Sequence, residues 1–159
     1  MYSRVILALT AIWVAQAASA EQSALMDIVR GADHQVEIYI ADHAPPDFDS
    51  VLGVLYRSRL AVTVLVSPEA TDAAGILRQA NDALDFFSEI DPPTLCILQE
   101  AGSDRDILIV DHLSYRTDFK PENARAFIGV LDGTMEELVY PAALEIAEFM
   151  EGLSGTCNL

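Results

Sequence analysis

The sequence predicts an α/β fold, a layered sandwich in which helices flank a mostly parallel central sheet. Segments 60–66 and 107–110 are almost wholly apolar and rich in β-branched residues, which is typical of strands buried on both faces of a parallel sheet. Segment 71–87 places apolar residues along one helical stripe. Because such strands and helices alternate along the chain, we expect the two kinds of element to pack in layers.

The predicted elements follow in chain order: helix 23–30, strand 36–40, helix 51–57, strand 60–66, helix 71–87, strand 94–98, strand 107–111, strand 125–131 and a final helix ending at Gly152. Asp49 or Ser50 can cap the second helix, because a short polar side chain accepts a hydrogen bond from a free amide. Thr134 and Glu137 form a capping box for the final helix. Strands 94–98 and 107–111 are close in sequence, which favours a hairpin or a short insertion between them.

The first 20 residues have the pattern of a cleavable export signal. Arg4 precedes an apolar core at 5–15, and Ala18-Ser-Ala20 is an A-x-A cleavage site. The core is too short for a comfortable membrane span, and no later stretch approaches the roughly 18 apolar residues that one requires. We expect a signal peptide at 1–20, one domain over 21–159 without a transmembrane segment, and a periplasmic or secreted location.

The charge of the chain argues against nucleic acid as a partner. The chain has 25 Asp and Glu against 9 Lys and Arg, and its net charge is −16 with neutral His. Since the signal carries one cation and no acid, the mature chain is expected to be at −17. Such a field repels phosphate backbones and anionic lipid, which bind to clustered Lys and Arg. Most of these carboxylates serve solubility.

Two cysteines lie in the exported part, Cys96 within a strand and Cys157 in the C-terminal tail. An oxidising compartment permits a disulfide between them, which would tie the tail to a central strand and stabilise the fold by about 4 kcal/mol on the entropic account. The alternative is that Cys96 is a buried apolar residue and Cys157 a free thiol. The sequence leaves both open.

Carboxylates surround the apolar strand 107–110. Asp104, Asp106 and Asp111 have the spacing Asp-x-Asp-x4-Asp. This spacing resembles the His-x-Lys-x4-Asp signature of the phospholipase D superfamily, with only the final Asp retained. The order of elements over nearly the whole mature chain is similar to that of the small exported bacterial endonucleases with a single signature, including the basic turn Tyr56-Arg-Ser-Arg59 before strand 60–66.

The resemblance implies a phosphodiesterase site that has lost its catalytic His and Lys. In the family the His is the nucleophile and the Lys holds the phosphate, whereas Asp104 and Asp106 stand at these positions. Each carboxylate would repel a phosphodiester by about 1 kcal/mol at ~4 Å even in a water-like dielectric. We therefore expect a binding or protein-interaction module without catalysis, with a protein partner. The resemblance also implies a homodimer through the signature face, which clustered acids would oppose at low salt.

Two alternatives remain. In the first, Asp42, His43, Asp111 and His112 converge where parallel strands end and hold a divalent metal for a phosphodiesterase-type hydrolase, since Asp and His suit Mn²⁺ or Zn²⁺. Without such a metal no cofactor is expected. In the second, the fold is thioredoxin-like or flavodoxin-like and the signature spacing is coincidence.

Overall fold

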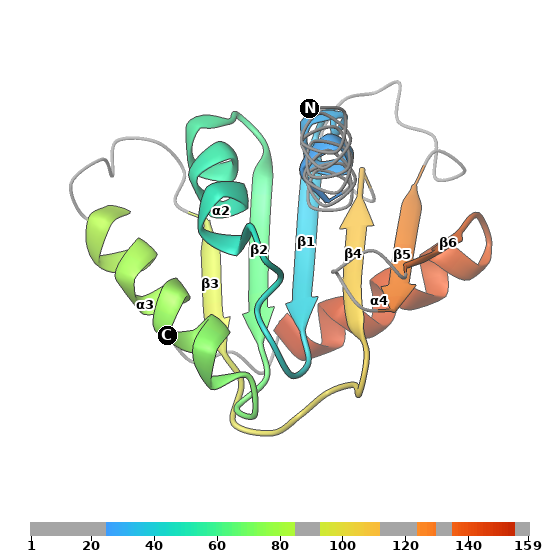
Figure 1. Ribbon diagram of the computed structural model, residues 1–159. Helices are drawn as coiled ribbons and strands as arrows, with labels where there is room; N and C mark the ends of the chain where they lie inside the picture. The colour runs from blue at the N-terminus through green and yellow to red at the C-terminus, as the bar shows by residue number, and fades with distance from the viewer. Residues whose placement is uncertain (1–24, 85–92, 112–123, 130–134, 155–159) are drawn as a thin grey trace, which may run out of the picture.

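A six-stranded mixed sheet forms the centre of the protein (Figure 1), seen in a computed structural model that describes residues 25–84, 93–111, 124–129 and 135–154. The strands are β1 (Gln35–Ile40), β2 (Ala61–Val66), β3 (Thr94–Ile97), β4 (Asp106–Val110), β5 (Arg125–Gly129) and β6 (Glu136–Leu138). Their order across the sheet is β3-β2-β1-β4-β5-β6. The α/β class predicted from the sequence is confirmed.

The expectation of a mostly parallel sheet is wrong. β1, β2 and β3 run parallel to one another, whereas β4 pairs antiparallel with β1, β5 with β4, and β6 with β5. The expected hairpin between β3 and β4 is also wrong, because β2 and β1 lie between them in the sheet. β4 runs in the opposite direction to β3 because the segment 98–105, which connects the two strands, contains no helix. Parallel pairing needs a long crossover connection, so a short connection returns the chain in the opposite direction.

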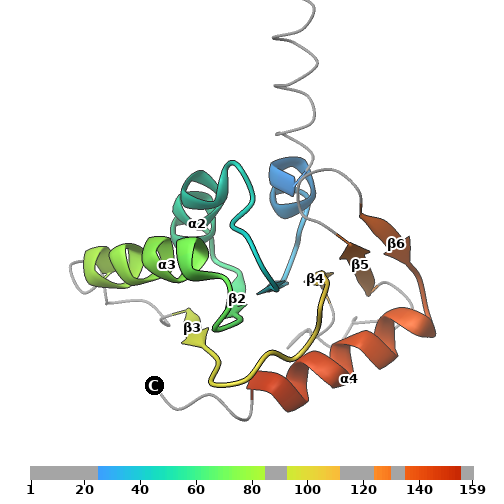
Figure 2. The same ribbon diagram turned by 60° about the horizontal axis from the view of Figure 1, so that its bottom comes forward.

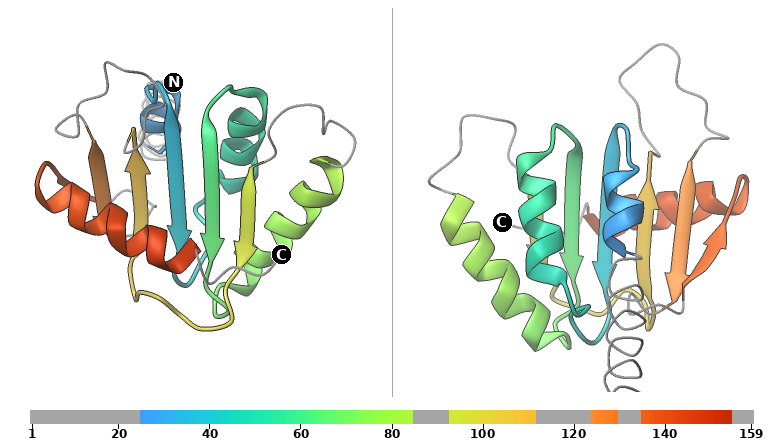
Figure 3. Two further views of the ribbon diagram at one scale, coloured as in Figure 1. Left: turned by 180° about the vertical axis from the view of Figure 1, so that it is seen from behind. Right: turned by 45° about the horizontal axis from the view of Figure 1, so that its top comes forward.

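Helices cover both faces of the sheet. A helical segment at 25–30, α2 (Phe48–Arg57) and α3 (Thr71–Leu84) lie on one face, and α4 (Ala142–Ser154) lies on the other (Figure 2). From behind, α4 runs obliquely across the antiparallel half of the sheet (Figure 3). In the part of the chain that the structure describes, no helix is long and apolar enough to cross a membrane.

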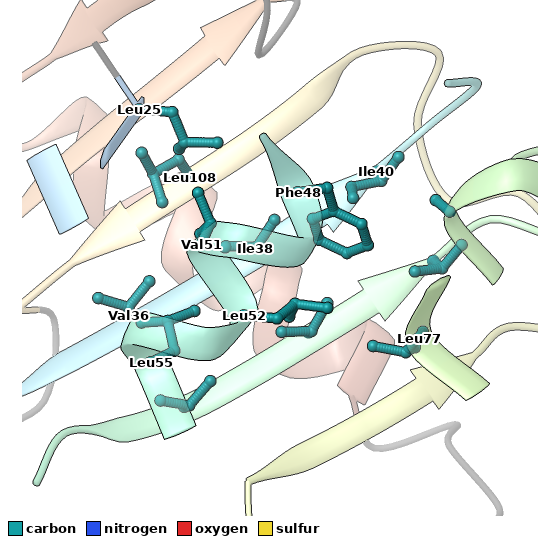
Figure 4. Close-up of a cluster of buried hydrophobic side chains, with 14 of the residues drawn as sticks. Leu25, Val36, Ile38, Ile40, Phe48, Val51, Leu52, Leu55, Leu77 and Leu108 are labelled. Carbon is teal, nitrogen blue, oxygen red and sulfur yellow. The ribbon is translucent and has the colours of Figure 1, made fainter. Parts of the chain in front are cut away.

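The alternation of side chains along β1 builds a separate core on each face. Val36, Ile38 and Ile40 point toward α2 and are fully buried, and Phe48 and Leu52 of α2 pack on them (Figure 4). The opposite face carries a smaller core of side chains from the sheet and from α4, which includes Tyr39, Leu65, Cys96, Ile107, Ile109, Ala126, Ala143, Ala147 and Met150. β1 is therefore buried on both sides, as a central strand requires.

The C-terminal elements differ from the predicted ones. The structure has the short strand β6 where the sequence predicted the start of the final helix, and α4 begins only after Pro141. Glu137 is not part of a capping box: it pairs with Arg125 of β5, with Nε 2.7 Å from Oε1. Thr134 lies outside the described residues. α2 begins at Phe48, one residue after Asp47, so neither Asp49 nor Ser50 caps it.

The hydroxyl of Tyr39 holds the loop that leads into β4. This side chain is fully buried, and its oxygen lies 3.0 Å from the backbone nitrogens of Gly102 and Ser103 and 3.0 Å from the carbonyl oxygen of Ser103. The hydroxyl therefore accepts from two amides and donates to one carbonyl. Leu153 of α4 covers Gly102, where an added Cβ would lie 2.7 Å from the Leu153 methyl carbons. Hydrogen bonds from β1 and packing from α4 thus fix the loop together.

Replacing Tyr39 by Phe removes the hydroxyl and keeps the ring. We expect a loss of about 1 to 2 kcal/mol in the free energy of unfolding, because two amides and a carbonyl lose their partner. Urea unfolding followed by circular dichroism measures the loss. Tyr140→Phe is the matched control, since Tyr140 is 50% exposed. Equal stability of the two variants would contradict the anchoring role of Tyr39.

Candidate functional site

The carboxylate of Asp111, the one residue that matches the signature, binds the backbone at the start of β1. Its Oδ1 accepts hydrogen bonds from the amides of His34 at 2.7 Å, Asp33 at 3.1 Å and Gln35 at 3.2 Å, and its Oδ2 accepts from Asp33 at 3.2 Å. The amide of Asp111 donates to the carbonyl of Gln35 at 3.0 Å. Asp111 has a φ of 57°, a conformation that Asp and Asn tolerate better than most residues. Asp111 is thus a backbone anchor.

Asp106 has the same kind of role at the other end of β1. It is buried at 6% exposure, and its Oδ1 accepts a hydrogen bond of 2.8 Å from the amide of Ala41. Because β4 runs antiparallel to β1, its first residue lies beside the end of β1 and Asp111 lies beside the beginning. The two side chains therefore hold both ends of the central strand, through hydrogen bonds that they accept from the backbone amides of His34 and Ala41.

Asp104 lies in a different environment from the other two signature positions. It lies exposed in the bend before β4, whereas Asp106 and Asp111 bind backbone at opposite ends of β1. The structure therefore does not bring the three carboxylates together. In the described ranges, no group of three or more His, Cys, Asp or Glu side chains is placed to hold a metal ion.

Asp42 and His43, which were predicted to converge with Asp111 and His112, lie at the opposite end of β1 from Asp111. Asp42 and His43 follow β1, with Asp42 Oδ2 3.3 Å from His43 Nε2 and both side chains well exposed. Asp111 lies beside Gln35 at the start of β1. At about 3.4 Å per residue of strand, this position is roughly 20 Å from Asp42. His112 lies outside the described residues. The expectation of one site failed for Asp42, His43 and Asp111 because it assumed that β1 and β4 are parallel.

Cys96 lies buried in β3, on the face that α4 covers. Cys157, its predicted partner, lies outside the described residues. Cys96 is disulfide-bonded, and its pairing with Cys157 in particular stays a prediction.

Sequence reasoning missed Glu37, a buried carboxyl group in the middle of β1. Glu37 is 8% exposed, and Gln35 Nε2 donates to its Oε1 at 2.8 Å. Among the described residues, its Oε2 has no hydrogen-bond partner. Burial, with a smaller contribution from the negative charge of Glu151 on α4, raises the pKa of Glu37 to about 7. The polar residues at positions 35 and 37 of an otherwise apolar strand were the available signal, because they share one face.

A cleft that sequence reasoning also missed lies at the amino ends of β1 and β2. Its volume is about 480 Å³, and it is lined by residues 29, 30, 32 and 33 and by residues from α2 and the turn before β2. Three arginines line it: Arg30, Arg57 and Arg59. The sequence showed Arg57 and Arg59 only as a basic turn, and nothing in it placed Arg30 beside them.

No protein-family model and no curated protein sequence matches this chain.

Replacing Asp111 by Ala removes the anchor, and replacing it by Asn keeps most of it. Ala leaves three amides without their acceptor and is strained at positive φ, so we expect a loss of about 3 kcal/mol in the free energy of unfolding. Asn retains an oxygen at the Oδ1 position and tolerates this φ, so we expect a loss below about 1 kcal/mol. Chemical unfolding of the two variants measures the difference. Equal losses would contradict the anchoring role.

The buried carboxyl of Glu37 makes stability depend on pH. The pKa is about 7 in the folded state against an ordinary 4.5, so between these values the unfolded chain releases a proton that the folded chain retains. The free energy of unfolding therefore falls as pH rises from 4.5 to 7, by on the order of 3 kcal/mol. Glu37→Gln removes this contribution and raises stability at pH 8.

Unfolding measured at pH 5 and pH 8 tests the Glu37 prediction. Glu148→Gln is the control, because Glu148 is an exposed glutamate of α4 and its replacement changes the net charge equally. The same pH profile for both variants would show that Glu37 is not the group responsible.

Proposed function

We propose that the protein is an exported, phospholipase D-like domain that has lost catalysis and works by binding another molecule. The observation that supports this most is the use of the signature positions. The carboxylates of Asp106 and Asp111 accept hydrogen bonds from backbone amides at the two ends of β1. Groups that hold the central strand in place are not free to act on a substrate.

The chemistry of phosphodiester cleavage supports the same proposal. Cleavage through a covalent intermediate needs a nucleophile with an available lone pair and a cation that stabilises the transferred phosphoryl group. Asp104 and Asp106 supply negative charge at the positions of both groups. Asp104 is exposed, so its carboxylate is hydrated and adds repulsion toward a phosphate.

Two surface properties suit a binding module. The chain is strongly acidic at −16, which disfavours nucleic acid and other extended polyanions as partners. Val139, Tyr140 and Phe149 are large apolar side chains with 63%, 50% and 42% exposure. Phe149 belongs to α4, whose next residue, Met150, is buried in the core. The proposed function requires neither metal nor cofactor.

Hydrolysis of bis(4-nitrophenyl) phosphate tests the loss of catalysis. We expect the purified protein to show no turnover above buffer, with or without a chelator. Asp104→Asn is the informative variant, because Asp104 is exposed and its replacement leaves the fold intact. Asp27→Asn, at an exposed position of the first helical segment, is the control. Turnover that chelation or Asp104→Asn abolishes, and Asp27→Asn does not, would contradict the proposal.

A further inference from the structure

The cleft at the amino ends of β1 and β2 concentrates positive charge in an acidic protein. Arg30, Arg57 and Arg59 line it together with a single acid, Asp33, which gives a local charge of +2 on a chain of −16. Arg30 ends the helical segment 25–30, Arg57 ends α2, and Arg59 lies in the turn before β2. The fold thus brings three cations from three places to one opening, which we call the arginine rim (Arg30, Arg57, Arg59).

The arginine rim is available for a ligand. In the described part of the chain, no arginine of the rim lies within 4.0 Å of a carboxylate. Arg125, which is not part of the rim, forms an ion pair with Glu137. All three rim residues are exposed. Arg57 Nε donates to the carbonyl of Gly53 at 3.2 Å, which orients the guanidinium while its terminal nitrogens remain available. Pre-orientation lowers the entropic cost of binding.

Apolar side chains complete the cleft. Val29 is 1% exposed, and Val54 and Leu60 are partly buried and pack against the main core. We call these three residues the apolar floor. The volume of about 480 Å³ is in the range of small-molecule sites, which combine apolar walls with a few polar groups.

The wall of the cleft is held by the anchor at Asp111. Asp33 lines the cleft, and its amide donates to both carboxylate oxygens of Asp111. The amide of Ala61, next to Leu60, donates to the carbonyl of His34 at 3.0 Å. The hydrogen bond between Ala61 and His34 therefore joins the two segments that carry Leu60 and Asp33, and the Asp111 side chain holds the segment of Asp33.

We propose that this cleft binds a small amphipathic oxyanion, a carboxylate or a phosphate monoester attached to a short apolar chain. The planar fork of arginine matches the oxygens of both groups. The arginine rim contacts the anion, and the apolar floor contacts the chain. A polyanion does not fit, because only the cleft is positive and the surrounding surface repels extended negative charge. This inference deepens the proposed binding function and rests on it.

Isothermal titration of the purified protein at low ionic strength tests the inference with four probes: hexanoate, hexyl phosphate, inorganic phosphate and hexan-1-ol. We expect at least one of the two amphipathic anions to bind with a Kd of about 1 mM or tighter. The preference between hexanoate and hexyl phosphate identifies the anion. Arg57→Gln and Arg59→Gln each weaken binding about three- to tenfold, and 0.5 M salt weakens it further.

Arg78→Gln is the matched control, because Arg78 is exposed on α3 and does not line the cleft. The inference is overturned if neither anion binds, if hexan-1-ol binds as tightly as the anions, or if the rim variants behave like Arg78→Gln. Inorganic phosphate that binds as tightly as hexyl phosphate overturns the role of the apolar floor. If no probe binds and the protein shows no phosphodiester turnover, the inference about the cleft fails while the proposed binding function stands. If the protein shows phosphodiester turnover, the proposed function itself fails.

Discussion

The antiparallel pairing of β4 with β1 determines what each carboxylate of the signature strand does. It places Asp106 beside the end of β1 and Asp111 beside its beginning, where the carboxylates accept hydrogen bonds from backbone amides. Amides at the two ends of a central strand need partners, because an unpaired buried amide costs about as much as a lost hydrogen bond. The position of β1, and through it of both cores and of the loop held by Tyr39, depends on this pairing.

The same pairing places different side chains at the two ends of β1. The carboxyl edge of β1 carries the exposed Asp42 and His43 and Asp72 of α3, which accepts from the amide of Ala44. The amino edge carries Asp111 and the arginine rim. A ligand site at the carboxyl ends of parallel strands is the usual expectation. Here the cleft and the arginine rim lie at the amino ends of β1 and β2, opposite to that usual position.

Local patterns in the sequence predict the existence of elements better than their direction. The β-branched run in β2 and the apolar stripe of α3 led to the right elements, and the parallel placement of β2 is confirmed. The apolar run in β4 indicated burial correctly but carried no information about direction, so Asp42 and Asp111 were placed together wrongly. β6 was missed because Glu136-Glu-Leu138 is too short to show a period. The burial of Glu37 and the arginine rim depend on tertiary placement, which no local pattern contains.

Amide hydrogen exchange, measured by NMR, tests most directly the claim that the signature aspartates anchor β1. The comparison is between the amide of His34, which binds Asp111, and the amide of Ala41, which binds Asp106. In Asp111→Ala we expect His34 to lose far more protection than Ala41, and in Asp106→Ala we expect the reverse. Equal changes at both amides in both variants, or no change at either, would contradict it.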